Sequence, residues 1–253
     1  MSSNIDEFKK YIRGKFIMKK IKVFCLPYAG GSKTIYSDWI KQYSDIAEII
    51  PIEYSGHGSR FGDELYNDAN KISSDVFDTI VKLNPENYIL YGHSMGSLIA
   101  YLTGYKLEQE YKYPPKALII GGTRPPHLKY KDEQLSNLSK EKLINKMIGL
   151  GQMDDEIINE PELLDLLADI FKADIYADEK YVEDKTKKVK CPVFVATGVA
   201  DEEAPLADME EWKMYTLGFF SAKSFDGSHF FPFINKKYPL YLEDIIRNVT
   251  AQN

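Results

Sequence analysis

The chain has 253 residues, enough for one large domain or two small ones. Apolar residues make up 44% and charged residues 28%, so a full hydrophobic core is expected without metal or disulfide staples. The net charge of −6 gives no reason to expect a nucleic-acid partner, and no apolar run is long enough to span a membrane.

Residues 1–20 carry charges throughout and lack the apolar core of a signal peptide. We expect them to form a tail, partly helical, before a single domain over residues 21–253, and Met18 is an alternative start. Cys25 and Cys191 lie in apolar runs without metal-ligand spacing. This pattern is typical of buried thiols in a reducing cytoplasm, and it predicts no metal site.

Apolar runs rich in β-branched and aromatic residues predict strands, and amphipathic runs between them predict helices. The strands are expected over residues 21–26, 49–54, 88–91, 117–120, 193–197 and 220–225. The helices are expected over residues 36–47, 72–83, 97–108, 205–215 and 238–249. This alternation predicts an α/β fold, with a mostly parallel sheet covered by helices on both faces.

The alternation is interrupted before the strand at residue 193. The intervening segment has no convincing strand but shows helical patterns over residues 140–150 and 161–173, the second with a wide apolar stripe. We interpret residues 131–185 as a helical insertion that forms a lid over the sheet. A helical layer without a gating role is the alternative.

A G-x-S-x-G motif, Gly92-His93-Ser94-Met95-Gly96, lies between an expected strand and an expected helix. A serine on such a sharp turn projects its hydroxyl, and the flanking glycines let strand and helix pass closely. Ser94 is therefore the predicted nucleophile. The alternative is a tight turn in which Ser94 only caps the helix.

A serine nucleophile needs a base and an orienting carboxylate. For a serine at such a turn, the expected chain order is serine, acid, histidine, and only His229 follows a late strand. Asp201 lies in the loop after the preceding strand and is the predicted acid, with Glu202 and Glu203 as alternatives. The N–H groups of Met95 and Ala29 are the expected oxyanion donors.

With these segments placed, the chain resembles the type II thioesterases of nonribosomal peptide and polyketide synthases. The resemblance spans nearly the whole chain and is carried by residues 24–32, 56–60, 92–97, 124–126, 138–143, 161–164, 191–193, 204–205 and 227–231. Two departures stand out. The family usually has Gly-Arg in the loop where this chain has Gly56-His57-Gly58, and it often has a polar residue just before its aspartate, where this chain has Ala200.

The resemblance implies an α/β-hydrolase fold with a helical lid and hydrolysis of acyl thioesters on carrier proteins. By the same match, Ser94 is the nucleophile, His229 the base and Asp201 the acid, with Ala29 and Met95 at the oxyanion hole. No cofactor is implied, because phosphopantetheine belongs to the substrate. We expect a cytoplasmic monomer that edits stalled or wrongly primed synthases.

The resemblance also implies a carrier protein that is acidic around its modified serine. This chain is acidic too, so docking would need local basic residues. Loops expected at the carboxyl edge of the sheet contain the candidates Lys33, Arg60, Arg124, Lys129 and Lys131. Ordinary solvated charges are the alternative for these residues. For the whole chain, the alternatives are an esterase-like or lipase-like hydrolase of small oxoesters and a catalytically silent scaffold.

Overall fold

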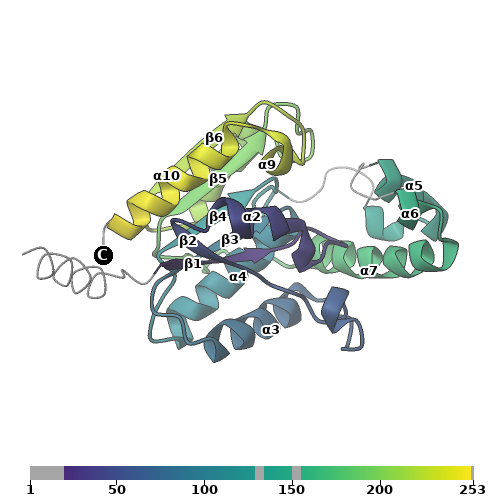
Figure 1. Cartoon of the computed structure of the whole chain (residues 1–253), viewed down its shortest axis with the longest axis horizontal. Helices are drawn as coiled ribbons and strands as arrows, with labels where there is room; N and C mark the ends of the chain where they lie inside the picture. The colour runs from purple at the N-terminus through teal and green to yellow at the C-terminus, as the bar shows by residue number, and fades with distance from the viewer. Residues whose placement is uncertain (1–19, 129–133, 150–154, 252–253) are drawn as a thin grey trace, which may run out of the picture.

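A computed structural model of the chain describes residues 20–128, 134–149 and 155–251 (Figure 1). Its six strands form one sheet in the order β2-β1-β3-β4-β5-β6, and every neighbouring pair is parallel. The strands are β1 (Ile21–Leu26), β2 (Ala47–Pro51), β3 (Tyr88–His93), β4 (Ala117–Gly121), β5 (Val193–Gly198) and β6 (Phe220–Phe225). The predicted parallel α/β sheet is confirmed; the predicted tail over residues 1–20 lies almost entirely outside the described residues.

Side chains of the central strands alternate between two cores, because successive residues of a strand point to opposite faces. In β1, Phe24 and Leu26 belong to one core, whereas Val23 and Cys25 belong to the other. Each core needs its own cover, which explains why nearly every residue of β1 is buried.

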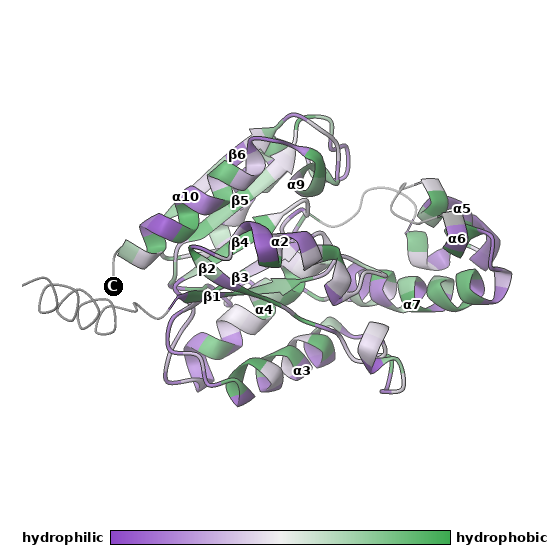
Figure 2. Ribbon diagram, in the orientation of Figure 1, coloured by the Kyte–Doolittle hydropathy of each residue, from purple (hydrophilic) through white to green (hydrophobic). Residues whose placement is uncertain are grey.

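Helices cover both faces of the sheet (Figure 1). On one face lie α3 (Ala69–Lys82) and α4 (Met95–Glu110), and on the other lie α2 (Ser37–Gln42) and α10 (Tyr238–Ala251). Figure 2 shows green, apolar stretches in these helices alternating with purple, polar ones. The apolar side of α3 includes Ile72, Val76 and Ile80, which are all buried, as its 3.6-residue period predicts.

The segment between β4 and β5 is helical and projects to one side of the sheet (Figure 1). It contains a 3-10 turn at Leu135–Asn137, α5 (Lys140–Gly149), α6 (Asp155–Ile158) and α7 (Pro161–Lys180). Leu143 of α5 and Ala168 of α7 are fully buried within the same core cluster. Residues 131–133 and 150–154 of the predicted insertion lie outside the described residues.

Several helix boundaries differ from prediction. The helix expected over residues 36–47 is a 3-10 turn (Lys33–Tyr36) followed by α2, which ends at Gln42, and residue 47 already belongs to β2. The helix expected over residues 205–215 is α8 (Leu206–Met209) followed by a 3-10 helix (Glu210–Tyr215). A 3-10 helix places residues three apart on one side, and Trp212 and Tyr215 are both buried. The 3-10 turn Gly58–Arg60 and α9 (Phe231–Ile234) are not anticipated by the sequence patterns.

No helix within residues 20–128, 134–149 and 155–251 combines the length and apolar character needed to cross a membrane.

Candidate active site

Ser94 occupies the turn between β3 and α4. Its backbone has φ 54° and ψ −127°, a conformation that residues with a side chain rarely adopt. The Ser94 side chain makes no capping hydrogen bond to α4, so the alternative of a merely capping serine is wrong. Its N–H donates to the carbonyl of Gly121 at the end of β4, 2.7 Å away. Such a strained turn holds the hydroxyl at the carboxyl edge of the sheet.

The crossing of β3 and α4 around Ser94 is very close. A Cβ atom on Gly92 would lie 2.6 Å from Cα of Ser97, in the first turn of α4. The Ser97 hydroxyl secures this crossing, because it lies 2.8 Å from the carbonyl oxygen of Gly92 and accepts the N–H of Gly121 at 2.9 Å. The close passage expected at the glycine before Ser94 is confirmed.

His229 and Asp201 come together although they lie 28 residues apart. They follow β6 and β5, which are adjacent parallel strands and therefore end at the same edge of the sheet. Nδ1 of His229 lies 3.0 Å from Oδ2 of Asp201, whose side chain is fully buried. The two loops touch at Gly198, where a Cβ atom would lie 2.9 Å from the carbonyl carbon of Gly227.

Asp201 is better placed than its acidic neighbours to orient His229. Its Oδ1 accepts the N–H groups of Glu203 and Ala204 at 3.0 and 3.2 Å, which leaves Oδ2 for the imidazole. Glu203 has its Oε2 3.9 Å from Nδ1 of His229 and is 47% exposed, and Glu202 is also exposed. The geometry therefore favours Asp201.

The surroundings of His229 favour its protonated form. Burial lowers the pKa of His229, because it disfavours the charged imidazolium. The hydrogen bond and negative charge of Asp201, with a contribution from Glu203, outweigh burial and raise the pKa above its ordinary value. Because Nδ1 is engaged by Asp201, Nε2 is the nitrogen left to exchange a proton.

Ser94 and His229 line one cavity of about 380 Å³. Within the described residues no hydrogen bond joins the Ser94 hydroxyl to His229, and catalytic hydrogen bonds often tighten only when substrate is bound. The insertion supplies apolar side chains to this cavity: Leu135, Met147, Ile157, Leu167, Ile170, Phe171 and Ile175. A carbon chain attached to Ser94 would find an apolar environment there.

A narrower crevice of about 50 Å³ also reaches Ser94. Thr123, Arg124, Pro125 and Pro126 form part of its lining. Ser94 thus lines two cavities, a larger one that is mainly apolar and a smaller one that is partly polar.

The expected oxyanion donors lie on two elements that meet at Ser94. Met95 is the first residue of α4, so its N–H has no carbonyl one turn earlier to bond. Ala29 lies in a turn closed by a 2.9 Å hydrogen bond from the N–H of Gly31 to the carbonyl of Tyr28. Ala29 and Ser94 both line the larger cavity.

None of the remaining histidines is paired with Asp201, although the ring centroid of His93 lies 5.2 Å from that of His229. His93 is fully buried, and burial keeps its pKa well below the ordinary value. His127 has Nδ1 3.1 Å from the hydroxyl of Tyr215. His57 lies 2.9 Å from Asp174 on α7, a buried pair that the sequence analysis did not identify. Asp174 itself could have indicated the pair, because it is a carboxylate on the apolar side of α7, and a buried carboxylate needs a partner.

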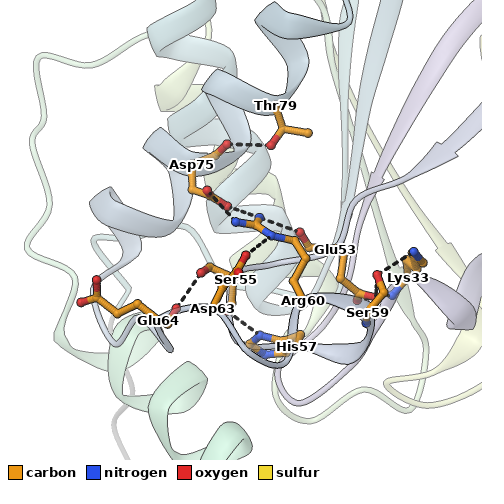
Figure 3. A network of polar contacts seen from close by, with 10 residues as sticks. All are labelled: Lys33, Glu53, Ser55, His57, Ser59, Arg60, Asp63, Glu64, Asp75 and Thr79. Atoms are coloured by element: carbon orange, nitrogen blue, oxygen red, sulfur yellow. Dashed lines mark hydrogen bonds and ion pairs between the residues drawn. The ribbon is translucent and has the colours of Figure 1, made fainter.

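Three of the basic residues expected to bind an acidic partner already form hydrogen bonds or ion pairs within the chain, and Figure 3 shows two of them, Lys33 and Arg60. Arg60 places Nη1 2.5 Å from Asp75 of α3, and the ammonium group of Lys33 donates to Ser59 at 2.8 Å. Arg124 places Nε 2.7 Å from Asp208. Lys129 and Lys131 lie outside the described residues.

In the described part of the chain, no cluster of histidine, cysteine, aspartate or glutamate is arranged to hold a metal ion.

Known proteins resemble this chain in both sequence and fold. The family model "Thioesterase domain" matches residues 21–252. The chain is 26% identical over 213 residues to the "S-acyl fatty acid synthase thioesterase, medium chain" of Rattus norvegicus, covering 83% of this chain and 81% of that protein. It is 27% identical over 212 residues to "Thioesterase PikA5" of Streptomyces venezuelae, covering 83% of this chain and 75% of that one.

Among solved structures, the thioesterase RedJ from the prodiginine biosynthetic pathway in Streptomyces coelicolor superposes with a TM-score of 0.80. It is 27% identical, and the match covers 90% of this chain and 85% of RedJ.

Proposed function

The chain belongs to the thioesterase domain family, and from this premise we propose that it is a type II thioesterase of nonribosomal peptide or polyketide biosynthesis. It would remove stalled or wrongly primed acyl groups from carrier proteins. One observation carries the proposal: Ser94, on a strained turn, shares a cavity with His229, which is hydrogen-bonded to buried Asp201.

The first step transfers the acyl group to Ser94. As the Ser94 hydroxyl attacks the thioester carbonyl, Nε2 of His229 takes its proton, and Asp201 stabilises the resulting imidazolium. The carbonyl oxygen becomes an oxyanion that accepts the N–H groups of Ala29 and Met95. Collapse of this intermediate breaks the carbon–sulfur bond, and His229 returns the proton to the departing thiol.

The second step releases the acid. Water attacks the acyl-serine carbonyl, and His229 again accepts a proton while the same two N–H groups stabilise the oxyanion. The serine leaves with that proton and the free enzyme is restored. The chain needs no cofactor for either step, since phosphopantetheine enters as part of the substrate.

The two cavities at Ser94 suit the two ends of such a substrate. The apolar cavity would receive the acyl chain, and the narrow crevice beside Arg124 would receive the pantetheine arm. The helical insertion would act as the lid of the acyl cavity, because its apolar side chains form part of the lining of the cavity that Ser94 also lines. Buried thiols at Cys25 and Cys191 suit a cytoplasmic enzyme.

The decisive experiment compares Ser94→Ala with the wild-type protein on an acyl-carrier protein. We expect Ser94→Ala to lose at least about 10³-fold in kcat and to show no labelling by a fluorophosphonate probe. Ser44→Ala is the matched control, because Ser44 is exposed and does not line the cavity. Near-normal turnover by Ser94→Ala would rule out the proposed nucleophile.

Carrier docking is tested separately at the basic residues. Arg60 and Arg124 already pair with carboxylates, which directs the test to Lys129 and Lys131. We expect the double change Lys129→Glu and Lys131→Glu to raise KM for an acyl-carrier protein but not for a small acyl thioester. The exposed Lys236, changed to Glu, serves as the control. An equal change in KM for both substrates would show that these lysines do not bind the carrier protein.

The esterase alternative is tested by kinetics on matched thioesters and oxoesters. A type II thioesterase should show the higher kcat/KM on the carrier-bound thioester, whereas a small-molecule esterase should prefer the oxoester. The scaffold alternative predicts no labelling of Ser94 at all.

A further inference from the structure

One carboxylate oxygen links the helical insertion to the loop that contains Ala29. Oδ2 of Asp174, on α7, accepts the N–H of Gly30 at 2.7 Å and lies 2.9 Å from Nε2 of His57. The Asp174 side chain is fully buried, and that of His57 is 3% exposed. Asp174 lies 144 residues from Gly30 and 117 from His57, so only the folded site brings them together.

The charge of His57 follows from its two partners. Nδ1 lies 3.0 Å from the carbonyl oxygen of Ser55, and Nε2 lies 2.9 Å from the Asp174 carboxylate. The carbonyl and the ionised carboxylate only accept hydrogen bonds, so these contacts favour a proton on each ring nitrogen and hence the cationic imidazole. Burial lowers the pKa of His57, but the hydrogen bond and charge of Asp174 outweigh it and raise the pKa.

The other groups around His57 support this cation. Glu53 adds a second negative charge, and its carboxylate is held by the N–H groups of Lys33 and Ser59. Tyr54 packs edge-on against the imidazole, and burial raises the pKa of its phenol well above the ordinary value, so it stays neutral. The guanidinium group of Arg60 turns toward Asp75 instead of His57 (Figure 3).

The N–H that Asp174 accepts belongs to the central peptide of a tight turn. Gly30 has φ 72°, Ala29 has no positive φ, and the N–H of Gly31 donates to the carbonyl of Tyr28. This is the arrangement of a type II turn. In the alternative type I turn, the peptide between Ala29 and Gly30 is flipped, and its N–H would no longer face Asp174. The carboxylate therefore stabilises one of two orientations of this peptide.

We propose that Asp174 and cationic His57 are positioning residues of the oxyanion hole: by holding the N–H of Gly30 they fix the turn in which the preceding Tyr28–Ala29 peptide carries the Ala29 N–H. The inference rests on the proposed role of the Ala29 N–H. When His57 loses one proton, one of its ring nitrogens faces an acceptor oxygen but has no hydrogen to donate. This loss weakens the group of contacts that holds the N–H of Gly30. Because Asp174 belongs to α7, the same contact couples docking of the insertion to assembly of the oxyanion hole.

The test measures kcat and KM of the full chain between about pH 6 and pH 10 on a small acyl thioester and a p-nitrophenyl ester. Asp174→Ala removes the acceptor. Asp174→Asn keeps an oxygen for Gly30 and offers an amide N–H to Nε2 of neutral His57. Asp169→Asn is the matched control on α7, because Asp169 is 58% exposed and pairs with Lys140.

We expect Asp174→Ala to lose about tenfold or more of kcat with little change in KM, since one oxyanion donor is worth roughly 10²–10³-fold. The wild-type kcat should fall on the alkaline side, as His57 loses its proton. Asp174→Asn should keep most of the neutral-pH kcat and lack that alkaline fall. Asp169→Asn should match the wild-type protein in both respects.

A folded Asp174→Ala variant with wild-type kcat would overturn the inference. So would an alkaline fall that persists unchanged in Asp174→Asn, and this second result decides the matter if Asp174→Ala does not fold. An oxyanion forms on oxoesters and thioesters alike, so the comparison holds even if the carrier-protein substrate is wrong. Failure of the proposed nucleophile would instead appear as turnover by Ser94→Ala.

Discussion

A Cβ atom on Gly96 would lie 2.5 Å from the carbonyl oxygen of Pro27. Helix α4 therefore reaches the loop of Ala29 only because residue 96 has no side chain. Gly96→Ala should push these segments apart and separate the two proposed oxyanion donors. We expect a loss of about 10²-fold or more in kcat, measured on an acyl thioester.

Gly149→Ala is the control for the Gly96 variant. Gly149 lies at the end of α5, and a Cβ atom there would meet nothing within 4 Å. We expect unchanged kcat and a gain of at most about 0.5 kcal/mol in unfolding free energy, since alanine favours a helix more than glycine does but residue 149 is the last of its helix. In contrast, Gly96→Ala should cost about 1–3 kcal/mol through overpacking. Equal activity of the two variants would contradict this account.

The raised pKa of His229 predicts how activity depends on pH. His229 must be neutral to act as a base, so kcat/KM should rise with pH through a value above the ordinary histidine pKa. Asp201→Asn removes the main cause of the upward shift, so the rise should move to lower pH while kcat drops by about 10⁴-fold. Glu203→Gln should move the rise in the same direction by less, with most of kcat retained. A rise that stays in place in both variants would exclude His229 as the titrating base.

The strands of the sheet and the three proposed catalytic residues could be predicted from local sequence patterns. The buried strands of a parallel sheet are short apolar runs, and β1 and β6 begin and end at the predicted residues. Ser94, Asp201 and His229 each follow a strand, and parallel strands bring their carboxyl ends to one edge. Their grouping near one cavity therefore depends on chain order and topology, which the sequence reveals.

Local sequence patterns were not sufficient to predict the end of helix α7 or the partner of Asp174. The apolar stripe predicts a helix over residues 161–173, which places Asp174 just beyond its end. The helix instead continues to Lys180, and Asp174 is buried against His57. The partner that makes this burial possible lies 117 residues earlier, and no local periodicity encodes such a pairing.

Leu167 provides a test of the acyl cavity. It lines the cavity from α7, whereas Leu163, one turn earlier, is 41% exposed and does not. Leu167→Trp should fill part of the cavity and lower kcat/KM for the longest accepted acyl chains by about tenfold or more, with little effect on acetyl thioesters. Leu163→Trp should leave the chain-length profile unchanged. Equal loss for long and short chains in Leu167→Trp would show that the acyl group lies elsewhere.

The His57–Asp174 pair also predicts how stability depends on pH. The pKa of His57 is raised in the folded protein, so its contribution to stability is fully present below the unfolded histidine pKa of about 6.5. The contribution is lost as pH rises through the folded pKa. The difference in unfolding free energy between wild-type protein and His57→Gln, measured by urea unfolding, should therefore be largest at acid pH and shrink at alkaline pH. Buried His93, whose pKa is lowered, has the opposite dependence in both proteins and cancels in the difference. A difference that grows with pH would show that His57 is neutral in the fold.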